Sequence, residues 1–477
     1  MQNPTRTLLT VLAVGLSLAA RPDPVPAAAL PSAFAGQPGA QEDDPGGGPW
    51  AGGYEVERLP AVLPWRDRAE AVNRMLVDRL ENVLPRLMRE VGIDLWIVIN
   101  REYAEDPVYL TLVPEPAFAA RRTTMLVFHD RGEGQELERL TVARYPLGRL
   151  YRSTWDQGGT ADEQWARLAE LVAERDPARI GVNTSEHWAF GDGLSSGLRE
   201  RLERALGPEL APRLTSAQDL CVRWLETRTE LELEVYPQLV HLARAVIAEA
   251  FSEAVITPGL TTTDDVGWFI RQRFSELELP IWFQPYVNVQ RQALASAGPI
   301  MGEAGQVIRR GDVLHTDVGI SYLRLNTDTQ EMGYVLRPGE SDVPEGLKRA
   351  LAVGNRWQDL LTGSFAEGLT GNEVLAATRE RAAAEGIDCS VYTHPLGFHG
   401  HGAGPTIGMW DNQGPTPIRG DWPLHPMTAY SIEGSVTVPV PEWGDQPVQI
   451  KLEQDAWFDG ERVRYIGGRQ TRWHVVH

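Results

Sequence analysis

Two aspartates, Asp317 and Asp328, lie eleven positions apart in the segment HTDVGISYLRLNTDTQEM, residues 315–332. The pattern around them alternates between apolar and polar residues, which predicts two strands joined by a short turn. A buried carboxylate must be paired, hydrogen-bonded or bound to a metal, because an isolated charge in a low-dielectric interior is costly. Arg324 is the only Lys or Arg in the segment. The aspartates therefore either share a divalent ion or sit at strand ends that face solvent.

A histidine-rich run and two glutamates on strands follow later in the chain. HPLGFHGH, from His394 to His401, supplies imidazoles, which bind metals and carry protons near neutral pH. Glu433 in YSIEGS and Glu453 in IKLEQD each interrupt a run of strand-forming residues. A single glutamate of this kind is typical of a strand edge facing water. Together with the aspartates, one histidine and both glutamates form an oxygen-rich set that suits a pair of hard divalent ions and hydrolysis.

The ordered set Asp317, Asp328, His394, Glu433 and Glu453 resembles the ligands of the pita-bread metallopeptidases, which include methionine aminopeptidase, aminopeptidase P and prolidase. The similarity extends to the spacing of the aspartates, to the motif His-x-x-Gly-x-x-x-His, and to the Ser-Ile-Glu and Ile-x-x-Glu contexts of the glutamates. It covers roughly residues 223–470. The region before it resembles the N-terminal domain of aminopeptidase P, prolidase and creatinase. The resemblance implies an α/β N-terminal domain and an α+β pita-bread catalytic domain.

The resemblance also implies how two divalent metal ions would be held. Asp317 would bind one ion, and His394 and Glu433 would bind the other. Asp328 and Glu453 would bridge both ions. Manganese is expected because oxygen ligands dominate, with zinc, cobalt and iron as alternatives.

Further roles are implied around the metals. Glu433 would carry the proton, and His401 would bind the substrate carbonyl or the developing oxyanion. His399 is an alternative to the other two histidines if the loop is shifted. Trp410, beside the histidine run, is expected to contact the substrate.

The chain departs from the family at one position. Aminopeptidases of this group usually have another histidine about seventeen residues before the first aspartate, where this chain has Ile300. Loss of one transition-state hydrogen-bond donor costs a factor of about 10² to 10³ in turnover. The expected function is a metal-dependent aminopeptidase or dipeptidase that hydrolyses the N-terminal bond of short peptides, with Xaa-Pro peptides as candidates. The alternatives are a hydrolase of a non-peptide amide with the same fold and a catalytically silent binding module.

The elements that position these residues are organised in two folded units. At 477 residues the chain is too long for one ordinary core. Strands alternate with helices over 56–220, which predicts the α/β domain, and strands and helices segregate over 221–477. One long helix over 223–255, interrupted or kinked near Pro237, and a second helix with Thr263 or Asp264 as N-cap are expected, followed by helices over 342–362 and 371–385.

The N-terminus and the composition bear on partners and location. Arg6 followed by the apolar run 8–20 predicts a secretory signal within residues 1–35, cut after Ala20 or near 33–35, and a disordered linker over 36–55. A secreted or periplasmic protein without a stable membrane span after processing is expected. A net charge of −20 argues against nucleic acid as a partner. A homodimer is expected, and Cys221 and Cys389 form either one disulfide or two thiols.

Overall fold

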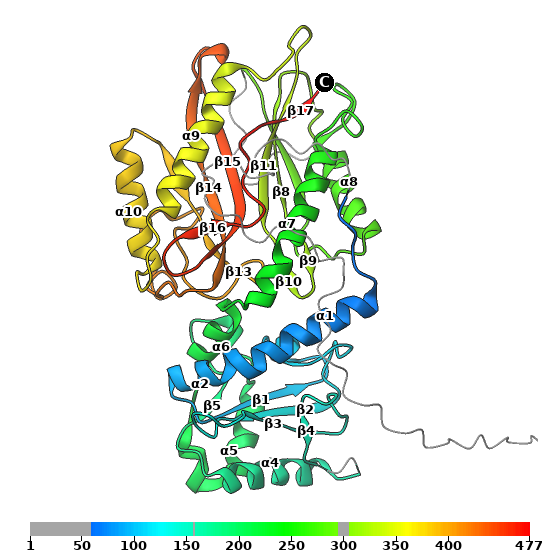
Figure 1. The fold of residues 1–477 in the computed structure, drawn as a ribbon, viewed down its shortest axis with the longest axis vertical. Helices are drawn as coiled ribbons and strands as arrows, with labels where there is room; N and C mark the ends of the chain where they lie inside the picture. Colours follow the sequence, from blue (N-terminus) through cyan, green and yellow to red (C-terminus); the bar gives the residue numbers. More distant parts are fainter. Residues whose placement is uncertain (1–58, 156–157, 294–304) are drawn as a thin grey trace, which may run out of the picture. The chain divides into compact units, whose positions relative to one another are not determined.

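Apolar strands and helices alternate in the N-terminal region, as expected for the predicted α/β domain, and the strands form a six-stranded mixed sheet. The computed structural model describes residues 59–155, 158–293 and 305–477, all within one compact unit. The strand order is β4-β3-β2-β1-β5-β6, and β1 pairs antiparallel with β2 and parallel with β5. Strands β1 to β5 are labelled in Figure 1. The strands are β1 (Leu95–Arg101), β2 (Thr123–His129), β3 (Glu138–Ala143), β4 (Arg152–Ser153), β5 (Ile180–Val182) and β6 (Leu214–Ser216).

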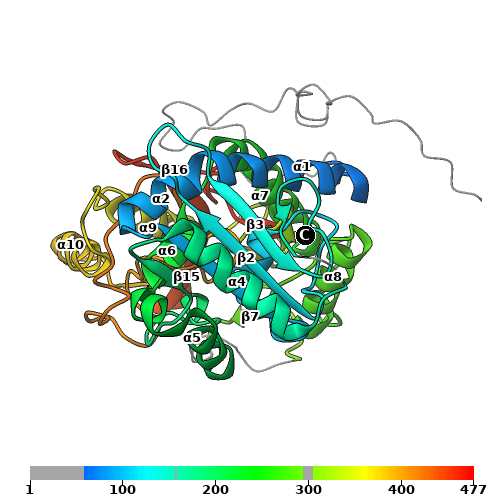
Figure 2. The same ribbon diagram turned by 90° about the horizontal axis from the view of Figure 1, so that it is seen from below.

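Helices cover both faces of this sheet, because consecutive side chains of a strand point to opposite sides. On β1, Leu95 and Ile97 belong to a core with α4 and α5, whereas Trp96 and Val98 belong to a core with α2 and α6. Figure 2 shows α4 lying across β2 and β3. The helices are α1 (Trp65–Asp78), a π-helical turn (Arg79–Val83), α2 (Leu84–Val91), α3 (Tyr109–Leu112), α4 (Ala161–Arg175), α5 (Ser196–Leu210) and α6 (Gln218–Glu226), with 3-10 turns at Ala189–Gly191 and Ala211–Arg213.

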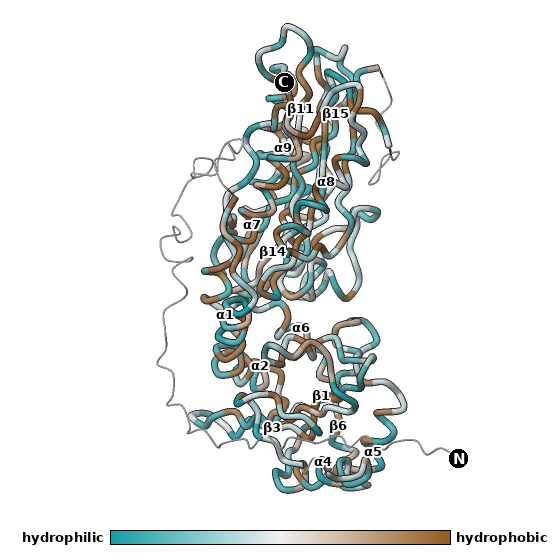
Figure 3. Tube along the Cα trace, turned by 90° about the vertical axis from the view of Figure 1, so that its right-hand side faces the viewer, coloured by the Kyte–Doolittle hydropathy of each residue, from teal (hydrophilic) through white to brown (hydrophobic). Residues whose placement is uncertain are grey.

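The second large sheet has nine strands. Its main order is β12-β14-β15-β11-β8-β7, and β13 pairs with β14, β16 with β15 and β17 with β11. Its strands are β7 (Tyr286–Gln290), β8 (Val313–Val318), β11 (Thr329–Val335), β12 (Cys389–Val391), β13 (His394–Leu396), β14 (Thr428–Val440), β15 (Gln446–Phe458), β16 (Val463–Tyr465) and β17 (His474–Val476). The helices are α7 (Glu230–Ala250), α8 (Thr263–Glu276), α9 (Glu345–Thr362) and α10 (Gly371–Ala384), with a 3-10 turn at Pro441–Trp443. Hydrophobic stretches run along the buried strands and α7 (Figure 3). The predicted fold class, α/β followed by α+β, is confirmed.

The predicted hairpin that carries the two aspartates is present. β8 pairs antiparallel with β11, and the chain between them forms the short strands β9 (Ser321–Tyr322) and β10 (Leu325–Asn326). The two residues at the tip, Leu323 and Arg324, have φ of 54° and 65°. Such left-handed backbone usually favours Gly or Asn. The tip is therefore strained and needs contacts elsewhere to hold it.

Two details of the helix predictions are wrong. The helix expected over 223–255 is two helices, α6 and α7, and the break falls at residues 227–229, whereas Pro237 lies inside α7. Thr229 forms a reciprocal capping box with Glu232, which starts a new helix there. The N-cap of α8 is Thr262, boxed with Asp265, one residue before the expected position.

Several predictions lie outside the described residues or remain untested. The signal segment, the linker and Ile300 are not among the residues that the structure describes. The domain boundaries stay a prediction. Both cysteines are free thiols. In the described ranges, no helix combines the length and the hydropathy needed to cross a bilayer.

Candidate metal centre

Strand pairing brings the sequence-predicted acids into one row across the nine-stranded sheet. Gln330 of β11 is paired with Asp317 of β8 on one side and with Glu453 of β15 on the other. Glu453 is in turn paired with Glu433 of β14. Directly opposed residues on neighbouring strands point to the same face. Residues that are 136 positions apart in sequence, 317 and 453, therefore share one small patch of the sheet.

All five predicted ligands meet at this patch. The potential ligand atoms form three overlapping groups, and within each group all atoms lie within 4.8 Å of one another. The groups are Asp317, Asp328 and Glu453; His394, Glu433 and Glu453; and Asp328, His394 and His401. His394 Nε2 lies 3.5 Å from Glu433 Oε2 and 3.7 Å from Asp328 Oδ2. The second histidine of the motif, His401, thus joins the set at its edge.

Three buried atoms of the centre have no hydrogen-bond partner among the described residues: Asp317 Oδ1, His394 Nε2 and Glu433 Oε2. Buried polar groups are nearly always satisfied, and each exception needs an explanation. These three atoms belong to three strands and to the same cluster of ligand atoms. Four carboxylates and an imidazole are also the donor set that hard divalent cations accept. The residues present therefore fit a metal site.

The electrostatics of the centre point the same way. Burial raises the pKa of Asp317 to about 7. Burial, and then repulsion from neighbouring carboxylates, raises the pKa of Asp328, Glu433 and Glu453 well above the usual range. Like charges this close cannot all ionise without a compensating cation. A bound cation would reverse this penalty, and metal binding would release protons.

The histidines of the run differ in what they face. Burial lowers the pKa of His394 to about 4, so its imidazole is neutral near pH 7 and able to bind a metal. Its ring lies 4.7 Å, centroid to centroid, from that of His401. The His399 ring instead packs on Phe190 at 4.2 Å. This geometry favours His394 over His399 as the ligand, because only His394 lies among the clustered carboxylates.

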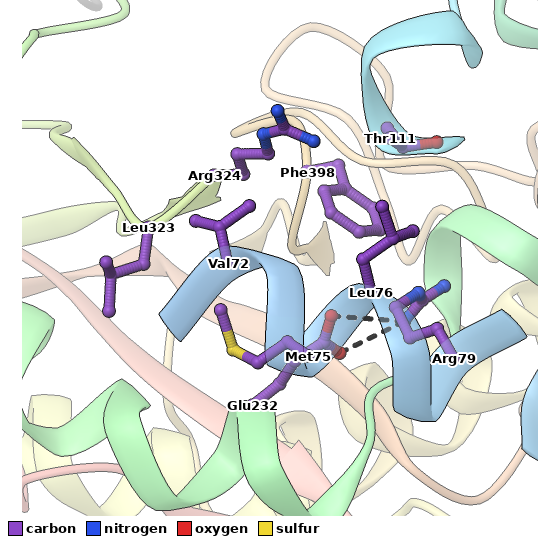
Figure 4. A pocket seen from close by; sticks show the side chains of 9 residues that line it. All are labelled: Val72, Met75, Leu76, Arg79, Thr111, Glu232, Leu323, Arg324 and Phe398. Carbon is purple, nitrogen blue, oxygen red and sulfur yellow. Dashed lines mark hydrogen bonds and ion pairs between the residues drawn. The ribbon is translucent and has the colours of Figure 1, made fainter. Parts of the chain in front are cut away.

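The histidine loop is held by two buried arginines. The guanidinium groups of Arg79 and Arg228 each lie 4.8 Å from the centroid of the Phe398 ring. Glu232 accepts hydrogen bonds from Arg79, and both side chains line the same pocket as Phe398 (Figure 4). At Gly397, with φ of 153°, a Cβ would lie 2.6 Å from the Arg228 guanidinium carbon. The glycine of the His-x-x-Gly motif is therefore required by this packing.

Trp282, which no sequence pattern singled out, packs against the histidine loop. Its indole packs edge-on against His401 at 5.1 Å and donates to the Thr327 carbonyl at 2.9 Å. A Cβ at Gly400 would lie 2.2 Å from this indole, so glycine is needed there too. Trp410, the expected substrate contact, is 52% exposed in a turn closed by hydrogen bonds between Met409 and Asn412.

Polar residues around the ligands were also missed. Tyr286 of β7 donates to Asp317 Oδ2 at 2.9 Å, and Ser431 donates to Glu453 Oε1. Lys451 lies close enough to interact electrostatically with Asp317 and Glu433, and burial lowers its pKa. Its place two residues before Glu453 was a usable signal, because residues i and i+2 of a strand share a face. The position of Tyr286 depends on the pairing of β7 with β8, and no pattern in the sequence indicated it.

Comparison with known proteins agrees with this geometry. Residues 238–457 match the profile of metallopeptidase family M24. No curated protein sequence matches the chain significantly.

Solved structures share the fold at low sequence identity. An X-Pro aminopeptidase from Thermotoga maritima is similar with a TM-score of 0.60 and 18% identity, over 82% of this chain and 100% of that chain. A Xaa-Pro dipeptidase from Bacillus anthracis has a TM-score of 0.55 and 18% identity, over 86% and 100%. A dipeptidase from Pyrococcus horikoshii has a TM-score of 0.53 and 18% identity, over 83% and 99%. The segment 238–457 is thus a family M24 segment with the pita-bread fold, and the chain is a metallopeptidase.

Proposed function

We propose that this metallopeptidase is a dinuclear aminopeptidase or dipeptidase that removes the N-terminal residue of short peptides, with Xaa-Pro peptides as the first candidates. The observation that carries the proposal is the convergence of three unpartnered buried atoms, Asp317 Oδ1, His394 Nε2 and Glu433 Oε2, from separate strands. The names of similar structures, an X-Pro aminopeptidase and a Xaa-Pro dipeptidase, support the substrate class.

Five side chains would hold the two ions: Asp317 on one, His394 and Glu433 on the other, with Asp328 and Glu453 shared. Manganese is the expected metal, because four of the five ligands are carboxylates. When bound, divalent ions of this kind acidify a water molecule and polarise the scissile carbonyl.

The protein's own groups would do the rest of the chemistry. Glu433 Oε2 would accept the proton of the attacking water and pass it to the leaving amine. Burial, and then the neighbouring His394, lowers the pKa of His401 to about 4. The neutral His401 would therefore donate one N–H bond to the substrate carbonyl oxygen as negative charge develops on it. The Trp282 indole would fix the position of this ring.

The wider setting follows from the sequence. We propose that the apolar run 8–20 exports the protein to the periplasm or the medium, and that the mature enzyme is a homodimer. Export is checked by the N-terminal sequence of the protein recovered outside the cytoplasm, and the dimer by light scattering.

The central experiment combines elemental analysis with peptide turnover. The purified protein should contain about two equivalents of divalent metal per chain, and a chelator should remove metal and activity together. Release of the first residue from Xaa-Pro dipeptides and tripeptides, restored by Mn²⁺, is the expected result.

Other outcomes favour the alternatives. If the protein binds metal and hydrolyses a non-peptide amide but no peptide, the substrate class is a non-peptide amide. Peptide binding without turnover, unchanged by Glu433→Ala, would identify a silent binding module. A protein that binds no metal at millimolar Mn²⁺ would overturn the proposal.

A further inference from the structure

Gln330 occupies the middle of the row of acids. It is paired with Asp317 on β8 and with Glu453 on β15, so its side chain lies between the two ends of the centre. It is 6% exposed. A buried amide has two N–H donors and one oxygen acceptor, and each needs a partner. The hydrogen bonds of the Gln330 amide therefore act directly on the predicted metal ligands.

The Gln330 amide nitrogen binds both glutamates. Nε2 donates to Glu433 Oε1 at 2.8 Å and to Glu453 Oε2 at 2.7 Å. Glu433 Oε2 is left as the oxygen without a partner among the described residues. Glu453 Oε1 accepts from Ser431 and lies 4.0 Å from His394 Nε2. One amide thus fixes which oxygen of Glu433 faces the histidine and holds the second oxygen of Glu453.

His315 fixes the orientation of the amide. Its Nε2 lies 2.7 Å from Gln330 Oε1, and its Nδ1 lies 3.5 Å from Asn288 Nδ2. Because both Gln330 N–H groups are used by carboxylates, Gln330 Oε1 must accept, and His315 Nε2 must carry the proton. A flipped amide would point its oxygen at two carboxylates and its nitrogen at an N–H. Such an arrangement repels on both sides.

We propose that the Gln330–His315 pair is a positioning device for the metal centre: His315 orients the Gln330 amide, which in turn sets Glu433 and Glu453 for metal binding. This inference rests on the proposed function in one respect, that the two glutamates are metal ligands. Residues hydrogen-bonded to ligands orient them, and their loss lowers metal affinity or activity about 10- to 100-fold.

The competing explanation is that Gln330 is merely a satisfied buried amide. Gln358 of α9 provides a matched control. It is fully buried, and its Nε2 likewise donates two bonds, to the Ile432 carbonyl at 3.2 Å and to Gln454 Oε1 at 2.6 Å. These partners are not among the predicted ligands. Gln330→Met and Gln358→Met therefore each remove a buried amide whose nitrogen donates two hydrogen bonds.

The experiment measures Mn²⁺ affinity by equilibrium dialysis and by the rise of Tm with Mn²⁺, beside kcat and KM for an Xaa-Pro dipeptide. Gln330→Met should weaken Mn²⁺ binding about 10- to 100-fold, whereas Gln358→Met should lower Tm and leave Mn²⁺ affinity within twofold. Equal Mn²⁺ affinity in Gln330→Met and the wild type overturns the inference. If Gln330→Met does not fold, Gln330→Asn, which keeps an amide of shorter reach, takes its place with the same expectation.

A double-mutant cycle tests the role of His315. His315→Leu should weaken Mn²⁺ binding in the wild-type background and have no further effect on affinity in the Gln330→Met background, because it acts through the amide. His315→Gln, which keeps a donor, should restore part of the loss. If the two substitutions lower Mn²⁺ affinity additively in the double variant, His315 acts independently of Gln330, and its proposed role in orienting the amide is overturned.

The outcome separates this inference from the proposed function. A wild-type protein that binds no Mn²⁺ defeats the proposed function itself. A wild-type protein that binds two equivalents, and a Gln330→Met variant that binds them equally well, defeats only the positioning role.

Discussion

Each buried carboxylate of the centre has a protonation state that depends on its neighbours. Burial and four neighbouring acids raise the pKa of Asp328, so that in the absence of a cation its charged form destabilises the fold. The same carboxylate becomes favourable once a cation is bound. On the proposed function, the carboxylates of this site would lower the stability of the metal-free protein and raise its affinity for a metal.

Asp328→Asn tests this exchange. The metal-free variant should have a Tm about 1 to 2 °C above the metal-free wild type, as expected for relief of roughly 1 kcal/mol in a chain of this length. The variant should also lose the rise in Tm with Mn²⁺ and the peptidase activity. Calorimetry with and without chelator measures both effects. Asp162→Asn, at a side chain that is 98% exposed, is the control and should respond to Mn²⁺ like the wild type.

Another buried acid, Asp106 in the loop between β1 and α3, predicts a pH dependence. Burial raises the pKa of Asp106 to about 6, although its carboxylate accepts bonds from the Val108 N–H and from Asn183. The folded state therefore holds its proton between about pH 4 and 6 while the unfolded state releases it. The contribution of Asp106 to stability should be present below about pH 4 and be lost as the pH rises through 6.

Urea unfolding of the wild type and of Asp106→Asn at pH 4, 5, 6 and 7 measures this contribution. The free energy of unfolding of the wild type, relative to that of the variant, should fall over this range. A constant difference between the two proteins would contradict the assignment.

Residue identity alone was enough to select the five predicted ligands that the structure brings together, but not the residues that hold them in place. Asp317, Asp328 and the motif histidines stand out because their types and spacing are unusual for buried strands. Gln330 and Tyr286 do not stand out, because their contacts depend on which strands pair and in which register. That register is fixed by packing between distant segments, which a single sequence does not display.

At the scale of elements, the loop that carries the histidines is held by close packing. Trp282 lies between the Asp317 hairpin and this loop, since a Cβ at Gly319 or at Gly400 would overlap its indole. The hairpin and the helices predicted over 342–362 and 371–385 followed from periodicity and turn residues, and the structure has these helices at Glu345–Thr362 and Gly371–Ala384. The break at 227–229 was missed because the apolar periodicity continues through it and outweighs the short capping signal.

Gly400→Ala should displace the indole and with it His401. The expected result is a kcat/KM lower by about tenfold to hundredfold, as for a small misplacement of a catalytic group, with Mn²⁺ affinity unchanged. Steady-state kinetics and dialysis measure the two quantities. In Gly197→Ala, where an added Cβ meets nothing within 4 Å, activity should stay at the wild-type level. Unchanged kcat/KM in Gly400→Ala would argue against the fixed indole.

At the scale of the whole molecule, the tip of the aspartate hairpin contacts the N-terminal region. Arg324 donates to the Leu110 and Val113 carbonyls, each at 2.6 Å, and pairs with Glu115 at 2.7 Å. The sequence predicted two α-and-β regions from the arrangement of their strands and helices. It did not predict this contact, because Arg324 had no partner nearby in sequence.

Arg324→Ala should lower the free energy of unfolding by about 2 kcal/mol, since charged hydrogen bonds and carbonyl partners are lost. The strained left-handed tip would then have less to hold it. Urea denaturation measures the change. Arg204→Ala, at a side chain that is 69% exposed and 3.9 Å from Glu200, should stay within about 0.5 kcal/mol of the wild type. Equal effects of the two substitutions would contradict the anchoring role.

The anchored tip has a thermodynamic corollary. Asp317 and Asp328 lie at the base of the hairpin whose far end Arg324 attaches to the carbonyls of residues 110 and 113. Linkage between two sites is reciprocal. If the Arg324 contacts raise cation affinity by some factor, cation binding stabilises the Arg324 contacts by the same factor. The ratio of the Mn²⁺ affinities of the wild type and Arg324→Ala would therefore measure how much cation binding at the base of the hairpin stabilises the contacts of its tip.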